Sequence, residues 1–184
     1  KKELLSFEEL YVFCRFMVER GIEQIRITGG EPLMRQGVVH FIAQLQDLRV
    51  LGLKRISMTS NAHYLKQYAH DLKMAGLDDL NISLDSLDAT QFLKMTKKSI
   101  VPVLAGICAA QQEGLKLKIN AVLMKGVNDN QIVPLTEWAL QQRIQLRFIE
   151  FMPLDGEQNW THADVVSEVE ILAVLKQHFQ VELK

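Results

Sequence analysis

The stretch Gln24-Ile-Arg-Ile-Thr-Gly-Gly-Glu-Pro32 decides the fold that this sequence predicts. A run rich in β-branched residues ends abruptly at two glycines, an acid and a proline, which is typical of a strand that enters a tight turn. Because glycine has no Cβ, a ligand can approach the main chain closely at Gly29 and Gly30. The stretch therefore predicts a strand with a binding turn, although a Gly-Gly pair by itself more often belongs to an ordinary loop.

The composition excludes several classes of protein. Of 184 residues, 48% are hydrophobic, which is enough for a sizeable core, and the formal net charge of -1 provides no field to attract nucleic acid or an anionic membrane. No apolar run approaches the roughly 20 residues that cross a bilayer, so we expect a cytoplasmic protein. We interpret Cys14 and Cys108 as buried side chains, because neither has the Cys or His spacing of a metal site.

Strands and helices are predicted to alternate along the chain, which favours right-handed βαβ units and a parallel sheet. Ser6 and Glu9 have the spacing of a capping box, and Asn128 or Asp129 is expected to cap a helix that ends near Gln142. Strands are predicted around Arg26 and over residues 54–61, 79–85, 117–124, 144–152 and 180–183. The helices between them are predicted over residues 7–18, 38–48, 64–75, 89–95, 101–113, 128–142 and 167–179.

Polar side chains recur at period two in these strands, so each set lies on one face of its strand. The sets are Arg26 and Thr28; Arg55, Ser57 and Thr59; Asn81, Ser83 and Asp85; and Lys118 and Asn120. A flat parallel sheet covered by helices on both sides would be apolar throughout. The pattern favours a barrel or part-barrel with a polar lumen, whose site lies at the carboxyl ends of the strands. An antiparallel sheet with one solvated face is the alternative.

Positive charges are expected deep in this lumen, at Arg26, Lys118 and Arg147. A buried charge without a partner is costly, so these cations need anionic groups nearby. A phosphorylated ligand would satisfy them, with arginine giving bidentate geometry and lysine a point charge. Internal pairing with Asp85 or Glu150 explains the pattern equally well.

Six segments resemble, in order and spacing, the MoaA family of radical S-adenosylmethionine (SAM) enzymes, the GTP 3',8-cyclases of molybdenum cofactor biosynthesis. They are Thr28-Gly-Gly-Glu-Pro32, Thr59-Ser-Asn61, Asn81-Ile-Ser-Leu-Asp85, Lys118-Ile-Asn-Ala121, Gly126-Val-Asn-Asp129 and Arg147-Phe-Ile-Glu-Phe-Met152. The first alone would indicate only the radical SAM superfamily. The resemblance implies an α/β fold, a partial TIM-like (β/α) barrel of the radical SAM type without its first strand. The barrel core would span residues 1–154, and residues 155–184 would begin a C-terminal region.

The resemblance also implies the residues of the site. Main-chain oxygens of the turn would hold the amino group of the cofactor SAM. This turn consists of Gly29, Gly30, Glu31 and Pro32. Ser83 would contact the ribose or carboxylate region of SAM, and Met152 would contact its adenine. The positions that match contacts to the substrate GTP are Arg26, Thr59, Lys118 and Arg147. No catalytic side chain and no metal ligand is expected in this sequence.

In the family, a [4Fe-4S] cluster reduces SAM to a 5′-deoxyadenosyl radical, which removes a ribose hydrogen from GTP so that the ribose carbon closes onto C8 of guanine. The cysteines that bind this cluster, and those of a second [4Fe-4S] cluster, have no counterparts here, and Cys14 and Cys108 cannot replace them. We therefore expect a substrate-holding core that is inactive alone. A further departure is Ala62, which stands where the family usually has glycine.

The resemblance implies GTP as substrate and a downstream pyranopterin-forming enzyme as partner. From the net charge and the lack of a long apolar run, we expect that neither nucleic acid nor a membrane is involved. A homodimer is left open. Two other functions are alternatives: a radical SAM enzyme that modifies a peptide or a haem precursor, and a non-catalytic fragment that binds nucleotides.

Overall fold

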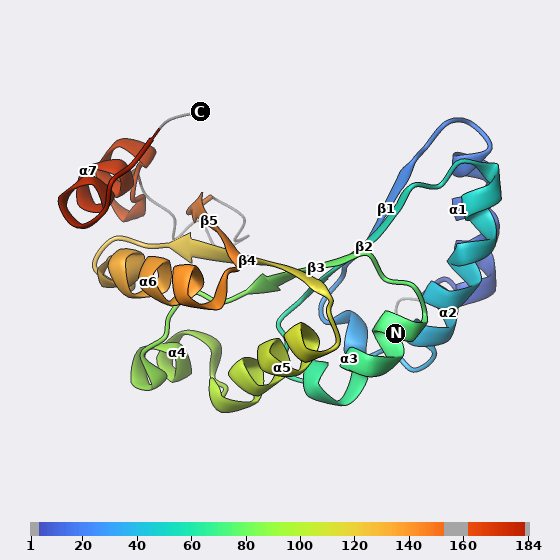
Figure 1. Cartoon of the computed structure of the whole chain (residues 1–184), viewed down its shortest axis with the longest axis horizontal. Helices are drawn as coiled ribbons and strands as arrows, with labels where there is room; N and C mark the ends of the chain where they lie inside the picture. Colours follow the sequence, from blue (N-terminus) through green and yellow to red (C-terminus); the bar gives the residue numbers. More distant parts are fainter. Residues whose placement is uncertain (1–3, 153–161, 183–184) are drawn as a thin grey trace. The chain divides into compact units, whose positions relative to one another are not determined.

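The computed structural model describes residues 4–152 and 162–182. The chain splits into two compact units, of which unit 1 comprises Lys1–Ile82 and Val101–Leu117, and unit 2 comprises Ser83–Ile100 and Lys118–Lys184. Figure 1 shows the elements in the order of the chain. The boundary expected between residues 154 and 155 lies outside the described residues and stays a prediction.

Unit 1 alternates strands with helices, as the sequence predicts. β1 pairs with β2 and β2 with β3, all parallel, so that Ile25 lies opposite Ile56, and Met58 opposite Leu80. Parallel strands need a crossover connection, which explains why helical segments lie between the paired strands. The elements are α1 (Phe7–Val18), β1 (Gln24–Ile27), η1 (Pro32–Met34), α2 (Val38–Leu45), η2 (Gln46–Leu51), β2 (Arg55–Ser60), α3 (Leu65–Met74), β3 (Asp79–Ser83) and α5 (Val101–Gln112).

Unit 2 holds a second parallel pair, β4 with β5, in which Asn120 lies opposite Arg147. Its elements are α4 (Ala89–Thr96), most of β4 (Lys116–Leu123), η3 (Asp129–Gln131), α6 (Ile132–Gln142), β5 (Gln145–Glu150), η4 (His162–Asp164) and α7 (Glu168–His178). Leu123, Ile132 and Ile171 are buried together and join β4 to α6 and α7. The α/β fold with parallel strands is thus confirmed. The expected terminal strand is wrong for its described part, because residues 180–182 form no strand.

Helix starts follow the local rules in most places. The N–H of Glu9 donates to Ser6 Oγ at 3.1 Å, and the N–H of Ser6 donates to Glu9 Oε2 at 2.7 Å, so the predicted capping box is confirmed. The predicted cap of α6 is wrong: α6 begins at Ile132, and its N-cap residue makes no side-chain hydrogen bond. Asn128 and Asp129 bond to other backbone groups instead.

Helices α3 and α5 pack against each other in unit 1 (Figure 1). The contact needs a glycine, because a Cβ at Gly106 would lie 2.6 Å from the carbonyl oxygen of Ala62. The buried face of α5 repeats at helical spacing through Val103, Gly106, Ile107 and Ala110. Cys108 lies off that face and is exposed, so its predicted burial is wrong, while Cys14 is half-buried.

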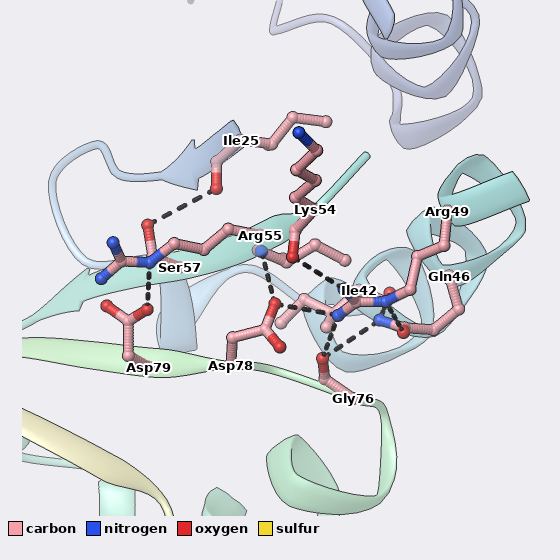
Figure 2. A network of polar contacts seen from close by, with 11 residues as sticks. Ile25, Ile42, Gln46, Arg49, Lys54, Arg55, Ser57, Gly76, Asp78 and Asp79 are labelled. Atoms are coloured by element: carbon pink, nitrogen blue, oxygen red, sulfur yellow. Dashed lines mark hydrogen bonds and ion pairs between the residues drawn. The ribbon is translucent and has the colours of Figure 1, made fainter. Parts of the chain in front are cut away.

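A polar network fastens the amino ends of β2 and β3 in unit 1 (Figure 2). Asp78 Oδ2 accepts from the N–H of Ile56 at 2.7 Å and from Arg49 Nη2 at 2.8 Å, and Arg49 also donates to the carbonyl of Gly76. These bonds lie at the end of the strands away from the Gly29-Gly30 turn. In parallel α/β folds that end serves stability, which frees the carboxyl ends for ligands.

Candidate functional site

The strands of unit 1 carry different chemistry on their two faces. In β2, Ile56 and Met58 are fully buried, whereas Arg55 and Thr59 on the opposite face are half-buried. Arg26 of β1 lies opposite Ser57 and donates through Nε to Ser57 Oγ at 3.5 Å. The predicted polar face therefore exists across β1 and β2.

The Gly29-Gly30 turn follows β1 and is exposed. Gly29 has φ of +146°, a conformation that side chains rarely adopt, and an added Cβ at either glycine would meet no atom within 4 Å. The main chain of the turn therefore borders open space, where a ligand can reach it. This geometry fits the expected contact with the amino group of a cofactor.

The carboxylate of Glu31 fastens this turn to the end of β2. Glu31 Oε1 accepts from the N–H of Leu33 at 3.1 Å and from Ser60 Oγ at 2.9 Å, and Oε2 accepts from the N–H of Asn61 at 2.7 Å. Both oxygens of the Glu31 carboxylate are thus occupied by hydrogen bonds within unit 1. The motif alone gave no sign of this role, because the bonds to Ser60 and Asn61 cross about 30 residues of sequence.

An ion pair lies farther from the turn on the same strands. Arg55 Nε donates to Asp79 Oδ2 at 2.5 Å, and Asp79 is 3% exposed. The hydrogen bond and the charge of Asp79 raise the pKa of Arg55. Arg55 is therefore engaged within unit 1, unlike the exposed Arg26, which faces a neutral hydroxyl.

Unit 2 contains the other residues expected at the site. Ser83 is exposed at the end of β3, and Met152 follows β5 with 50% of its surface exposed. Lys118 and Arg147 are half-buried in β4 and β5, and the register places Lys118 opposite Gln145, two positions before Arg147. Lys118 and Arg147 thus lie on neighbouring strands of one parallel pair.

The carboxylates proposed as internal partners of these cations have backbone partners. Asp85 Oδ1 accepts from the N–H of Val122 at 2.8 Å, and burial raises the pKa of Asp85. Glu150 Oε1 accepts from the N–H of Glu168 at 2.9 Å, in the first turn of α7, where a negative charge is favourable. One oxygen of each carboxylate is therefore engaged by the backbone of unit 2.

An apolar cavity of about 400 Å³ lies between α1, β1 and α2 in unit 1. Phe13, Cys14, Ile25 and Phe41 are among the residues that line it. Arg26 and Thr28 of the predicted polar set also line it, as does Arg35, so the cavity reaches these polar residues although most of its lining is apolar.

The family comparison identifies the chain. The model of the radical SAM superfamily matches residues 1–139. A GTP 3',8-cyclase of Staphylococcus aureus strain Mu3 is 39% identical over 184 residues, which is 99% of this chain and 54% of that enzyme. The chain therefore spans about half the length of the curated relatives it matches.

Solved structures agree with the fold. Streptococcus suis SuiB bound to S-adenosylmethionine has a TM-score of 0.77 at 16% identity, over 97% of this chain and 41% of that one. The coproporphyrinogen III oxidase HemN from Escherichia coli, described as a radical SAM enzyme, has a TM-score of 0.60 at 14% identity, over 91% and 44%. At such identities the likeness establishes the fold alone. In the described part of the chain, no helix has the length and apolarity to cross a membrane.

Proposed function

This chain belongs to the radical SAM superfamily, and on that premise we propose that it is the substrate-holding core of a GTP 3',8-cyclase of molybdenum cofactor biosynthesis. The observation that carries the proposal is the 39% identity to an enzyme of that name over 99% of the chain. The polar strand face and the open glycine turn support it. A peptide-modifying or haem-precursor activity has only fold likeness in its favour.

The residues proposed for SAM are the turn of unit 1 and two residues of unit 2. Main-chain oxygens of Gly29 to Pro32 would hold the amino group, and the open space beside the glycines fits such a contact. Glu31 would act by holding the turn rather than by touching the cofactor, since its oxygens already accept three hydrogen bonds. Ser83 would contact the ribose or carboxylate region, and Met152 the adenine.

The iron-sulfur clusters of the family need ligands that this sequence does not supply. Its two cysteines lie on α1 and α5, and Cys14 is half-buried whereas Cys108 is exposed. The activity would belong to an extended protein, in which this chain is joined to flanking segments that carry the cluster cysteines.

The residues proposed for GTP are Arg26, Thr59, Lys118 and Arg147. Arg26 supports this role because it is exposed on β1 and its Nε donates to a neutral hydroxyl, that of Ser57. Lys118 supports it because it is a half-buried cation in the parallel pair of unit 2. A downstream pyranopterin-forming partner, a homodimer, a cytoplasmic location and the absence of nucleic acid from the function stay predictions.

Calorimetric titration of the extended protein with GTP tests the substrate assignment. Lys118→Ala removes a charge-assisted hydrogen bond, so we expect GTP affinity to fall roughly tenfold or more. Lys116→Ala is the matched control, because Lys116 is an exposed lysine of the same strand. Equal GTP affinity in Lys118→Ala and in the parent protein would contradict the proposal that Lys118 contacts GTP.

A further inference from the structure

The segment Gly126-Val-Asn-Asp129 is part of the family resemblance, yet none of its residues has a place in the proposed sites. Asn128 within it is completely buried. Its side chain therefore cannot touch a ligand, and any role must be exerted through the groups that it bonds.

The amide of Asn128 joins two separate backbone segments of unit 2. Nδ2 donates to the carbonyl of Asp85 and to the carbonyl of Val122, both at 2.8 Å. Oδ1 accepts from the N–H of Met124 at 2.7 Å. One side chain thereby connects the chain after β3 with the carboxyl end of β4.

The two segments are also bonded to each other. Asp85 Oδ1 accepts from the N–H of Val122 at 2.8 Å, and the N–H of Leu84 donates to the carbonyl of Asn120 at 3.0 Å. Leu84 and Asp85 are therefore held by backbone and side-chain bonds, and Ser83 is the residue directly before them. Ser83 is exposed, so its direction depends on how firmly the next residues are held.

The turn that carries Asn128 is itself closed by Asp129. Asp129 Oδ2 accepts from the N–H of Gly126 at 3.0 Å, and Oδ1 accepts from the N–H of Asn130 at 3.1 Å. Gly126 has φ of +72°, which favours glycine at this position. Each named residue of the segment thus helps to place the amide of Asn128.

We propose that Asn128 is a positioning residue, which fixes Ser83 for contact with the cofactor by locking Leu84 and Asp85 to the end of β4. The inference rests on the SAM-binding role proposed for Ser83. It requires the amide specifically, because both carbonyls need a donor and the N–H of Met124 needs an acceptor. The substitution Asn128→Asp would keep the shape of the side chain but direct a carboxylate oxygen at two carbonyl oxygens.

Amide hydrogen exchange on the 184-residue chain tests the lock without any cofactor. In Asn128→Asp, we expect the amides of Leu84 and Val122 to exchange about tenfold faster or more, because the bonds that hold them weaken. The amide of Leu135, in the middle of α6, should keep its protection. Unchanged exchange at Leu84 and Val122 would overturn the lock.

Titration of the extended protein with SAM, together with steady-state kinetics, tests the consequence. We expect Asn128→Asp to weaken SAM binding and raise KM for SAM roughly tenfold, while KM for GTP changes less than about twofold. Asn130→Asp is the matched control, because Asn130 is exposed. Its Oδ1 accepts a hydrogen bond from Gln91 Nε2 at 3.0 Å, and a carboxylate oxygen would accept the same bond. It should resemble the parent protein in every measurement.

A second variant covers the case in which Asn128→Asp does not fold. Asp129→Ala opens the exposed turn and leaves the buried amide in place, so it should give the same pattern with smaller changes of about two- to fivefold. If both variants bind SAM as the parent does, the positioning role is wrong even though the proposed function stands. If the parent itself binds no SAM, the proposed function fails and this inference fails with it.

Discussion

The backbone N–H of Asn61 donates to Glu31 Oε2 at 2.7 Å, and this bond ties the turn after β1 to the end of β2. Ser60 Oγ donates to the other oxygen of the same carboxylate at 2.9 Å. Ser60 is 2% exposed, so the bond is shielded from water. The acid of the Gly-Gly-Glu-Pro motif therefore has a structural role in addition to its place in the sequence pattern.

Glu31→Gln should destabilise the protein by about 1–3 kcal/mol. Both oxygens of the carboxylate accept hydrogen bonds, so the NH2 group of glutamine would replace one acceptor and face a hydrogen-bond donor. Urea unfolding measures this change. In a double-mutant cycle with Ser60→Ala, the two losses should not add, since both variants break the same contact. Glu19→Gln, at the exposed C-cap of α1, is the control and should change stability by less than about 0.5 kcal/mol.

Additive losses in that cycle would mean that Glu31 and Ser60 stabilise the protein independently. The interpretation of the carboxylate as the link between the turn and β2 would then be wrong.

Ala62 has φ of +58°, in the left-handed region, and is completely buried. Ala62→Gly removes strain of about 1–2 kcal/mol, whereas it loses a buried methyl group worth about 0.8 kcal/mol and adds freedom to the unfolded chain worth about 0.4–1 kcal/mol. We therefore expect stability to stay within about 1 kcal/mol of the parent. Thermal or urea unfolding measures it.

Ala110→Gly is the matched control, because Ala110 is equally buried but lies in the helix α5. It loses a methyl group and helix propensity without any relief of strain, so it should cost about 1.5–2 kcal/mol. Equal losses in the two variants would show that the backbone at Ala62 carries no strain.

Gly106→Ala should destabilise unit 1 although alanine forms helices better than glycine. The added Cβ would lie 2.6 Å from the carbonyl oxygen of Ala62 and 3.0 Å from the Cβ of Leu65. Forcing α5 away from α3 costs about 1–3 kcal/mol, whereas the gain in helix propensity is about 1 kcal/mol. The expected net loss of stability is therefore up to about 2 kcal/mol. A calorimetric melting temperature above that of the parent would contradict the close packing of the two helices.

Glu170 should make the stability of the protein fall as the pH is lowered. Its hydrogen bonds with Lys125 and Ser167 lower the pKa of Glu170 to about 2, from an ordinary value of 4.5. A lowered pKa contributes stability that is complete above the ordinary value and is lost as the pH falls toward about 2. Glu170→Gln should therefore flatten the loss of stability between about pH 5 and pH 2.

The control for Glu170 is Glu137→Gln, which removes an exposed carboxylate of α6. It should keep the acid dependence of the parent. Because the pair of Lys125 with Glu170 is exposed, high salt should also reduce the difference between Glu170→Gln and the parent. If Glu170→Gln lost stability with falling pH just as the parent does, the acid dependence could not be attributed to Glu170.

Sequence reasoning succeeded where the signal is local or periodic. The Ser6 cap depends on a residue three positions away, and the faces of β2 depend on simple alternation, so both could be predicted. It failed at the α6 cap, because Asn128 bonds to Asp85, 43 residues earlier in the chain, in preference to the nearby helix. Such a contact leaves no periodic trace in one sequence.

The site shows the same division. The resemblance assigns roles to residues such as Gly29 and Arg26 from their types and spacing, and these roles stay predictions. It did not indicate that Glu31 holds the turn or that Glu150 accepts from the N–H of Glu168 at the start of α7, since each bond joins segments that only the fold brings together. Supporting contacts of this kind need a structure.

The most direct test of the central claim is anaerobic reconstitution of the extended protein with iron and sulfide, followed by addition of SAM, a reductant and GTP. Both 5′-deoxyadenosine and a cyclised GTP product should form, and neither should form with the present chain as control. Formation of 5′-deoxyadenosine with GTP unchanged would contradict the assignment of GTP as substrate, and formation of neither would contradict the assignment of a SAM-dependent activity as well.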